Sequence, residues 1–272
     1  MRIHQSAALT LATTVWCAHA GSVEFDAISP AVIQQRLETV SGNLPERRAT
    51  LERLFAGAGC MGENFTTQPV HGSKEPNLIC TLKGQDPAAG TIVVGGHFDF
   101  ITAGVGAVDD WSGAALLPSL YQSLKSRPRR HNYVFVAFAA EETGLNGSRE
   151  YVSKLSHEQR TAIHAMINLV CLGLTSPKIW ASRADPHLLE AYARVVDALH
   201  IQAGAVNVES LADDDSHPFR DARIPTLTIH SVTQATYPIL HTSRDRLSAI
   251  REDDYYAAYR VAAALLSFLD SD

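Results

Sequence analysis

Several apolar segments of the chain end in histidine or carboxylate side chains, the groups that can bind a metal or move a proton. These residues are His97 and Asp99, Asp109 and Asp110, Glu141 and Glu142, and His241. Imidazoles and carboxylates are typical zinc ligands. In open α/β sheets, functional groups collect beyond the carboxyl ends of the strands. The pattern therefore indicates a zinc site at one edge of a sheet.

Each of these groups also has a purely structural explanation. Asp109-Asp110 and Glu141-Glu142 would be favourable acids at helix N-termini, and a single histidine is commonly structural. The zinc interpretation therefore depends on the four groups occurring together. The remaining histidines outside the first 20 residues are expected at the surface or in packing roles, including His217 and His230.

The hydrophobic pattern predicts the sheet and the helices that must position these side chains. Short, largely apolar runs predict strands at Asn77–Leu82, Thr91–Gly95, Tyr133–Phe138, Ala165–Val170 and Pro225–Ile229. Helices are predicted at Pro30–Val40, Pro45–Ala58, Ser112–Lys125, Gly147–Leu155, Pro186–His200 and Asp253–Leu269. Strands that are apolar throughout and alternate with amphipathic helices are typical of a sheet covered on both faces. The sequence thus predicts a three-layer α/β/α domain.

The first 20 residues have the pattern of a secretory signal peptide. Arg2 precedes a short apolar stretch, which ends in an A-x-A cleavage motif at residues 18–20. An N-terminal membrane anchor is the alternative, but the stretch is shorter than the roughly 20 residues that span a bilayer. We therefore expect cleavage near Ala20/Gly21, a secreted or periplasmic protein, and no stable membrane insertion.

Residues 21–272 are predicted to form one domain. A chain of 272 residues with 46% hydrophobic residues can bury a full-sized core, and we find no repeat or linker that divides it. The net charge is −6 at pH 7, and loss of Arg2 with the leader would make it more negative. Nucleic acid is therefore an unexpected partner. The sequence predicts no oligomeric state.

Three cysteines follow the predicted leader. In an oxidising compartment Cys60 and Cys80 could form a disulfide, with Cys171 buried and reduced in its apolar run. The alternative is three unpaired cysteines acting as small apolar residues.

The order and spacing of the polar groups resemble metallopeptidase family 28, the two-zinc exopeptidases that include secreted bacterial aminopeptidases. The matching motifs are H-x-D at His97, D-D-x-S-G at Asp109, E-E at Glu141 and a late H-T at His241. The resemblance extends from about Asn77 to the C-terminus. It implies a central mixed, mostly parallel sheet, a zinc cofactor and peptide substrates.

The resemblance also implies a role for each residue at the first two motifs. His97 would bind one zinc, and Asp99 would orient the His97 ring. Asp109 would bridge the two zincs. Asp110 lies where family members have a cis peptide bond.

At the later motifs the resemblance implies a base and the remaining ligands. Glu141 would be the general base, while Glu142 and His241 would complete the zinc that Asp109 shares. The segment beginning at Asp213 is similar to the family's S-D-x-x-P-F stretch, with Asp215 at its acidic position. Asp215 is therefore a candidate for the wall of the site.

One family motif is broken. The pattern N-x-D, expected to supply another zinc ligand, is here Asn168-Leu169-Val170. Valine has no lone pair, so the zinc at His97 would keep only His97 and a share of Asp109. The neighbouring Cys171 could replace the ligand as a thiolate, but adjacent strand residues face opposite sides, so packing is the expected role of Cys171. We expect one firmly bound zinc at Asp109, Glu142 and His241, and a weakened second site.

The leading hypothesis is a zinc-dependent aminopeptidase acting on exported or extracellular peptides, with activity lowered by Val170. The first alternative is a zinc-bound pseudoenzyme that binds peptides without cleaving them. The second is a single-zinc acyltransferase similar to glutaminyl cyclases. The peptidase is preferred over the cyclase because Glu141-Glu142-Thr143-Gly144 resembles the peptidase branch.

Overall fold

The computed structural model describes residues 24–208 and 213–271. The predicted signal peptide and its cleavage site lie outside these residues. In the part of the chain that is described, no helix is both long enough and apolar enough to cross a membrane.

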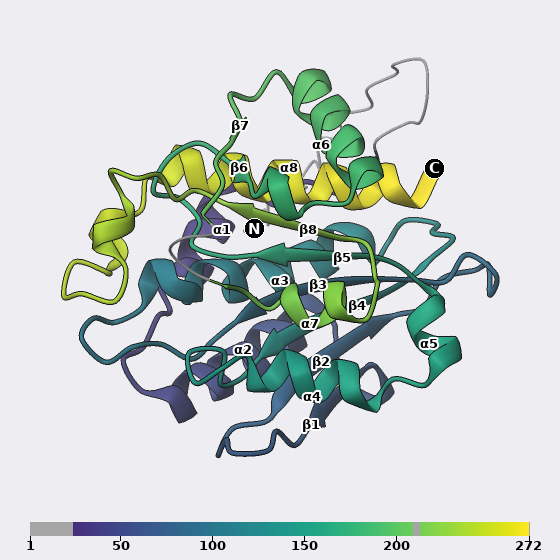
Figure 1. The fold of residues 1–272 in the computed structure, drawn as a ribbon, viewed down its shortest axis with the longest axis horizontal. Helices are drawn as coiled ribbons and strands as arrows, with labels where there is room; N and C mark the ends of the chain where they lie inside the picture. Colours follow the sequence, from purple (N-terminus) through teal and green to yellow (C-terminus); the bar gives the residue numbers. More distant parts are fainter. Residues whose placement is uncertain (1–23, 209–212, 272) are drawn as a thin grey trace, which may run out of the picture.

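The described residues form an eight-stranded mixed sheet in the order β1-β2-β4-β3-β5-β8-β6-β7 (Figure 1). The strands are β1 (Phe65–Gln68), β2 (Asn77–Leu82), β3 (Thr91–His97), β4 (Asn132–Phe138), β5 (Ile163–Leu169), β6 (Lys178–Ile179), β7 (Gly204–Ala205) and β8 (Thr226–His230). The central strands β4, β3, β5 and β8 are parallel to one another. Strands β1 and β2 add an antiparallel pair at one edge, and β6 is antiparallel to β8 at the other.

Helices cover both faces of the sheet and form the predicted α/β/α layers. The longer ones are α1 (Pro30–Leu37), α2 (Leu44–Ala58), α3 (Ser112–Leu124), α4 (Asn146–Lys154), α6 (Pro186–Leu199) and α8 (Glu252–Ser271), and the short ones are α5 (His157–Thr161) and α7 (His217–Asp221). Helices α1, α2, α3, α6 and α8 share one apolar core with the sheet. On the other face, α4 and α7 pack over a smaller core (Figure 1).

The two cores explain why the central strands are apolar throughout. In β3, Ile92 and Val94 face the larger core, whereas Val93 faces the smaller one. In β4, Phe135 and Val136 face the two cores in the same alternating way. Because successive strand side chains point to opposite faces, a strand covered on both sides needs apolar residues at every position.

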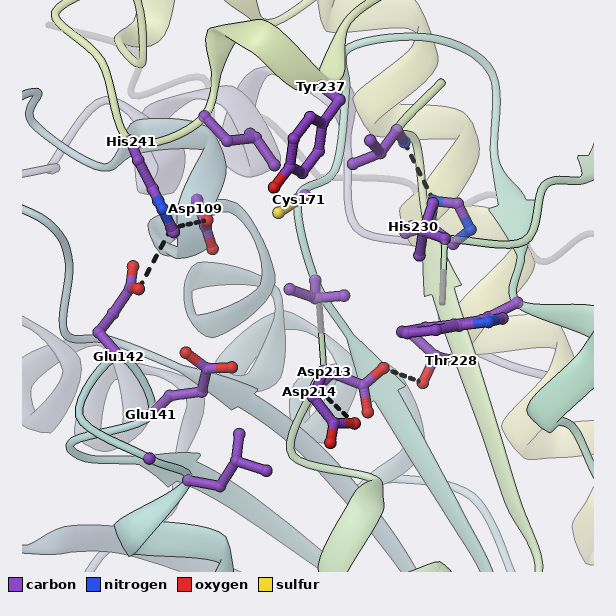
Figure 2. A pocket seen from close by; sticks show the side chains of 17 residues that line it. Asp109, Glu141, Glu142, Cys171, Asp213, Asp214, Thr228, His230, Tyr237 and His241 are labelled. Atoms are coloured by element: carbon purple, nitrogen blue, oxygen red, sulfur yellow. Dashed lines mark hydrogen bonds and ion pairs between the residues drawn. The ribbon is translucent and has the colours of Figure 1, made fainter. Parts of the chain in front are cut away.

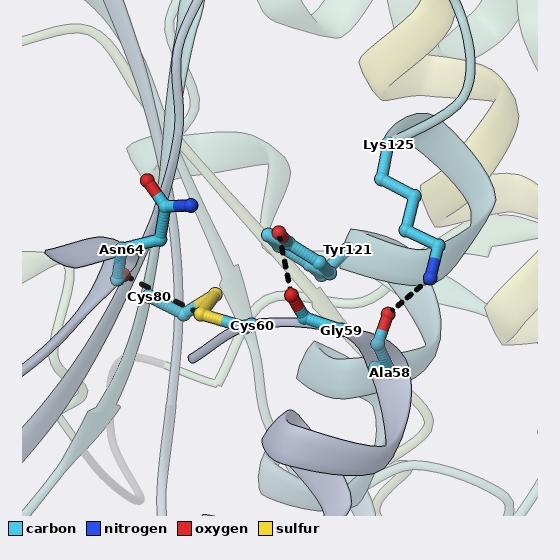
Figure 3. Close-up of a disulfide and its surroundings, with 7 residues drawn as sticks. All are labelled: Ala58, Gly59, Cys60, Asn64, Cys80, Tyr121 and Lys125. Carbon is cyan, nitrogen blue, oxygen red and sulfur yellow. Dashed lines mark hydrogen bonds between the residues drawn. A yellow bond between two sulfur atoms is a disulfide. The ribbon is translucent and has the colours of Figure 1, made fainter. Parts of the chain in front are cut away.

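Cys60 and Cys80 form a disulfide, as the oxidising-compartment interpretation predicts (Figure 3). Cys60 follows the C-terminus of α2, where Gly59 adopts a φ of 98°, and Cys80 lies in β2. The bond therefore ties the second helix to the antiparallel edge of the sheet. The remaining described cysteine, Cys171, is free and buried.

The predicted strands and longer helices are all present, with ends shifted by a few residues. Two differences affect the site. Strand β3 continues to His97 instead of ending at Gly95, and β5 ends at Leu169, one residue before the predicted end at Val170. The short strands β1, β6 and β7 and the helices α5 and α7 were not predicted.

Candidate metal centre

The polar residues of the four motifs meet at the carboxyl edge of the parallel strands. His97 is the last residue of β3, and Glu141 follows β4 by three residues. Asp109 lies in the irregular turn η2 (Ala107–Trp111), where its backbone is not helical, and this turn leads directly into α3. His241 follows the 3-10 turn η4 (Tyr237–Ile239). Because parallel strands point the same way, side chains from distant parts of the sequence reach one place.

Asp109, Glu142 and His241 form a group that can hold a metal ion. Their ligand atoms lie within 4.8 Å of one another. His241 Nε2 is 3.1 Å from Asp109 Oδ2 and 3.2 Å from Glu142 Oε2 (Figure 2). Glu142 Oε1 is buried and has no hydrogen-bond partner. An unpartnered buried carboxylate oxygen costs free energy, so this donor set fits a divalent cation such as zinc.

The backbone around Asp109 is held from several sides. The Asp109–Asp110 peptide is cis, as the family resemblance implies. Asp110 Oδ1 accepts hydrogen bonds from the backbone N–H groups of Gly113 and Cys171, at 2.9 and 3.0 Å. Asp245 Oδ1 accepts from Val108 N at 2.7 Å. Asp110 therefore joins the start of α3 to the end of β5.

Arg47 of α2 fixes the loop that precedes Asp109. Its guanidinium is fully buried and donates to the carbonyls of Phe98, Val105 and Gly106. The Arg47 Cζ also lies 4.2 Å from the Phe100 ring centroid, a cation–π contact. Burial lowers the pKa of Arg47 to about 10, so the group stays charged at neutral pH. Sequence reasoning missed this arginine because it lies in a helix with no recognisable motif.

Asp99 positions the two glutamates. Its Oδ1 accepts from Glu141 N at 3.0 Å and its Oδ2 from Glu142 N at 3.1 Å. These bonds anchor the turn after β4, where Ala140 has a φ of 57°. Asp99 also lies 3.4 Å from His97 Nδ1, but that nitrogen has no hydrogen-bond partner. The hydrogen bonds of Asp99 to the turn that carries Glu141 and Glu142 are therefore better defined than its contact with His97.

His97 contacts Asp109 directly. Its Nε2 lies 3.1 Å from Asp109 Oδ1 and 3.9 Å from Glu141 Oε2. Burial alone would lower the pKa of His97, but the charge of Glu141 and the hydrogen bond with Asp109 raise it well above its ordinary value. The ring nitrogen of His97 that faces the site, Nε2, is thus the atom that contacts Asp109.

The candidate ligands have strongly shifted pKa values. Burial, reinforced by the charge of Asp109, raises the pKa of Glu142 to about 7. The hydrogen bond with Asp109 raises the pKa of His241 to about 8. Burial would also raise the pKa of Asp109, but hydrogen bonds from His241 and His97 bring it below its ordinary value. A negative Asp109 is therefore balanced by two imidazoles.

Glu141 and Asp215 form a second pair of carboxyl groups. Burial raises the pKa of Glu141 well above its ordinary value, and the charge of Asp215 adds to the shift. Burial likewise raises the pKa of Asp215 to about 7. Asp215 is 1% exposed, and neither of its carboxyl oxygens has a hydrogen-bond partner. Asp215 lies behind the site, and its neighbours Asp213 and Asp214 line the cavity instead.

A cavity of about 330 Å³ opens beside the three candidate ligands. Figure 2 shows His241, Glu142 and Asp109 on one side and Asp213, Asp214, Thr228 and His230 on the other, with Cys171 and Tyr237 between them. A cavity of this size with apolar walls and a few polar groups is typical of small-molecule sites.

Val170 and Cys171 both line this cavity. The expectation that Cys171 faces away from Val170 is wrong, because β5 ends at Leu169 and strand alternation no longer applies. Cys171 instead has a φ of 52°. Its thiol is buried, which raises its pKa well above the ordinary value.

The two histidines expected to be structural have protein partners. His230 Nε2 donates to the Val206 carbonyl and its Nδ1 accepts from Val232 N. His217 pairs with Asp213 and Asp221. Neither belongs to the group that can hold a metal, although His230 also lines the cavity.

Comparison with known proteins agrees with this geometry. The family model for peptidase family M28 matches residues 77–266. "Aminopeptidase YwaD" of Bacillus subtilis is 29% identical over 199 residues, which are 70% of this chain and 42% of that protein. This chain thus spans about two fifths of the length of that relative.

Solved structures share the fold at lower identity. LapA aminopeptidase of Legionella pneumophila has a TM-score of 0.78 at 21% identity, covering 90% of this chain and 73% of that one. A glutaminyl cyclase of an Acidobacteriales bacterium has a TM-score of 0.70 at 19% identity, covering 89% and 93%. Both show that the fold is the α/β fold common to these enzymes. The family match covers most of the chain and includes every candidate ligand, so the protein belongs to peptidase family M28.

Proposed function

We propose that this protein is a zinc-dependent aminopeptidase that hydrolyses the N-terminal peptide bond of exported or extracellular peptides. The observation that carries the proposal is the convergence of Asp109, Glu142 and His241 on one point beside a buried glutamate and an apolar cavity. Membership of a peptidase family supports it. Each residue of the site can be assigned a role in that reaction.

Asp109, Glu142 and His241 would hold the zinc. The ion would act as a Lewis acid toward the scissile carbonyl and make water a better nucleophile. Glu141 would take the proton from the attacking water and pass it to the leaving amine. Asp99 would keep Glu141 and Glu142 in place through its bonds to their backbone N–H groups.

The residues around His97 do not fit a firmly bound second zinc. Val170 supplies no lone pair, so His97 and a share of Asp109 are the ligands that remain there. We therefore propose one firm zinc and one weak site. His97 would then act mainly by orienting and neutralising Asp109.

The second candidate function is a zinc-bound protein that binds peptides without cleaving them, and Val170 is the observation that favours it. In two-metal hydrolases both ions stabilise the developing charge, so loss of one ion lowers the rate. Val170→Asp separates the two functions. If wild type cleaves no peptide and Val170→Asp creates peptidase activity with a second bound zinc, the natural protein is a degenerate enzyme. If Val170→Asp binds a second zinc without a gain in activity, the second site was not limiting.

We propose that residues 1–20 are a signal peptide and that residues 21–272 form a single catalytic domain. The A-x-A motif before Gly21 supports this assignment. Mass spectrometry of protein recovered from the medium or periplasm should give an N-terminus at Gly21. An intact Met1 on the exported protein would contradict the proposal.

The first experiment is zinc content together with hydrolysis of a panel of aminoacyl p-nitroanilides. Wild type should hold close to one zinc and release p-nitroaniline. Glu141→Gln should keep the zinc but lose about 10²- to 10⁴-fold in kcat, the usual contribution of a general base. Glu190→Gln is a matched control, since Glu190 is an exposed residue of α6 paired with Arg194. Equal rates for Glu141→Gln and wild type would contradict the assigned base.

A further inference from the structure

The cavity at the candidate metal centre is lined by acidic groups. Carboxyl groups come from Asp109, Glu141, Glu142, Asp213 and Asp214, and the described lining residues include no lysine or arginine. Part of this charge would be offset in the zinc-loaded protein. A peptide carries an ammonium group at one end and a carboxylate at the other, and only the ammonium group is attracted to acids. The carboxylate of a bound peptide therefore needs a partner outside the cavity.

The cavity opens to solvent on the side of His241 and Gly144. The side chain of His241 is 51% exposed, whereas those of Asp109 and Glu142 are 10% and 8% exposed. Gly144, two residues after Glu142, lines the cavity and is exposed. Figure 2 shows His241 and Glu142 on the side opposite the closed end with Asp213 and Asp214. A peptide whose first residue lies in the cavity would therefore extend outward past this mouth.

Arg149 of α4 lies against the mouth. Its Nε donates to the Gly144 carbonyl at 3.1 Å, and the residue is exposed. Its other two guanidinium nitrogens have no hydrogen bond or ion pair to any residue that the structure describes. A guanidinium can bind a carboxylate through two parallel N–H···O bonds. Arg149 is therefore positioned and free to bind an anion beside the cavity.

The other exposed or half-buried arginines around the cavity are less suited to this role. Arg183 forms an ion pair with Asp213 at the closed end. Arg244 donates to the carbonyl of Pro238, which does not line the cavity. Arg149 is thus the arginine that contacts a lining residue and has no acidic partner among the described residues.

We propose that Arg149 binds the C-terminal carboxylate of short peptides and so makes dipeptides and tripeptides the preferred substrates. Each further residue moves that carboxylate by about 3.3–3.6 Å in an extended chain. A side chain held at the mouth can therefore reach it only in short peptides. This inference rests on the proposed aminopeptidase function and adds a class of substrate to it. Arg149 is a binding residue that contacts the substrate away from the cleaved bond.

The test compares L-leucyl-L-alanine with its C-terminal amide, which has no carboxylate. Release of leucine by the zinc-loaded protein gives kcat/KM for each, and the measured quantity is the ratio of acid to amide. Arg149→Gln should lower this ratio by about five- to tenfold, the size expected for one charge-assisted contact at an exposed position. High salt should lower the ratio in wild type but not in the variant, because salt screens exposed charges. Added alanine residues should remove the preference for the acid.

Arg160→Gln is the matched control. Arg160 of α5 is exposed, and its Nε also donates to a backbone carbonyl, that of Leu155, at 3.1 Å. Neither Arg160 nor Leu155 lines the cavity. The control removes the same charge, so an acid-to-amide ratio equal to that of wild type is expected. A ratio that falls equally in both variants would indicate a general charge effect and overturn the proposal. If Arg149→Gln slows acid and amide by the same factor, Arg149 only supports the Gly144 turn, and the proposal is wrong.

A binding measurement separates this inference from the proposed function. Calorimetry with the dipeptide and its amide is done on zinc-loaded Glu141→Gln, with and without Arg149→Gln. If wild type hydrolyses nothing but the acid binds more tightly than the amide through Arg149, the carboxylate site is supported and the peptidase function is wrong. If wild type and Arg149→Gln hydrolyse both substrates with the same ratio, the peptidase function remains and the carboxylate site is wrong. Equal binding of acid and amide to Glu141→Gln also overturns the carboxylate site.

Discussion

Glu141 and Glu142 are neighbours in the chain, yet their side chains meet different surroundings. Glu142 faces His241 at 3.2 Å and retains one unpartnered oxygen, which suits a metal ligand. Glu141 lies near His97 and Asp215, and burial raises its pKa well above the ordinary value. Two carboxyl groups in different surroundings can take different roles, one binding a metal and the other transferring a proton.

The role of Asp215 can be tested through the pH dependence of the reaction. Its charge raises the pKa of Glu141, so Asp215→Asn should lower that pKa. A general base is active when deprotonated, and the acidic limb of kcat/KM should therefore move to lower pH in the variant. The measurement is kcat/KM against pH on the preferred aminoacyl p-nitroanilide. Asp221→Asn, at the exposed end of α7, is the control, and an unmoved acidic limb in Asp215→Asn would contradict this role.

The candidate site residues could be predicted from the sequence, but their hydrogen-bond partners could not. The motifs identify Asp109, Glu142 and His241 because zinc ligands have restricted chemistry and recurrent spacing. The bonds of Asp99 to the backbone of the turn after β4 depend on the conformation of that turn, which the E-E motif does not specify. The direction of the Cys171 side chain depends on where β5 ends, which is Leu169 and not the predicted Val170. Strand ends are hard to predict because neighbouring strands and loops determine them.

At the scale of elements, α2 and the loop before η2 act as one unit. Arg47 donates hydrogen bonds to three carbonyls of that loop. Asp245, which follows His241 in the chain, accepts a hydrogen bond from Val108 N. Burial raises the pKa of Asp245 to about 6, although the Val108 N–H bond opposes this shift. Both residues thus hold the backbone next to Asp109.

Arg47→Met should destabilise the protein and weaken its hold on zinc. The variant keeps an apolar stem but removes the guanidinium donor from the carbonyls of Phe98 and Val105, while Gly106 keeps its bond from Trp111 N. The expected loss is on the order of 3 kcal/mol in the free energy of unfolding, because buried polar groups without partners are costly. Thermal unfolding and chelator competition for zinc measure the two effects.

The neighbouring Arg48→Met is the control for this change. Arg48 lies on the same helix, is 39% exposed in its side chain, and pairs with Glu52 and Glu75. Exposed ion pairs contribute little, so stability and zinc affinity should stay close to wild type. Unchanged zinc affinity in Arg47→Met would show that α2 does not position the site.

The larger elements could be predicted because their hydrophobic patterns are long. Strands β3 and β4 are apolar apart from their polar end residues, and α8 continues over 20 residues. Strands β6 and β7 have only two residues each, and they form because β6 pairs with the edge of β8 and β7 pairs with β6. A two-residue strand is too short to show a hydrophobic period, so its presence is determined by tertiary contacts.

At the scale of the whole molecule, the site makes stability depend on pH. Burial raises the pKa values of Glu142 and Asp215 to about 7, and the hydrogen bond with Asp109 raises that of His241 to about 8. The folded state then binds protons more tightly than the unfolded state, so stability falls as pH rises through these values. His230, whose pKa burial lowers to about 4, has the opposite effect, but only below pH 6.5.

The melting temperature of the metal-free protein should therefore decrease between pH 6.5 and 8. Zinc should reduce or reverse this decrease, since Glu142 and His241 bind a metal only when deprotonated and binding tightens as pH rises. Differential scanning fluorimetry with and without zinc, in buffers that do not bind metals, measures both curves. A metal-free melting temperature that is equal or higher at pH 8 would contradict the pKa shifts.

The position of Arg47 has a consequence for how the molecule can be divided. The segment that matches the peptidase family begins at residue 77, while Arg47 and one half of the disulfide, Cys60, lie before it. A fragment cut at that boundary would contain every candidate ligand but would lack the guanidinium that holds their loop. We therefore expect the smallest piece of this chain able to bind zinc to be longer than residues 77–266, the segment that matches the family.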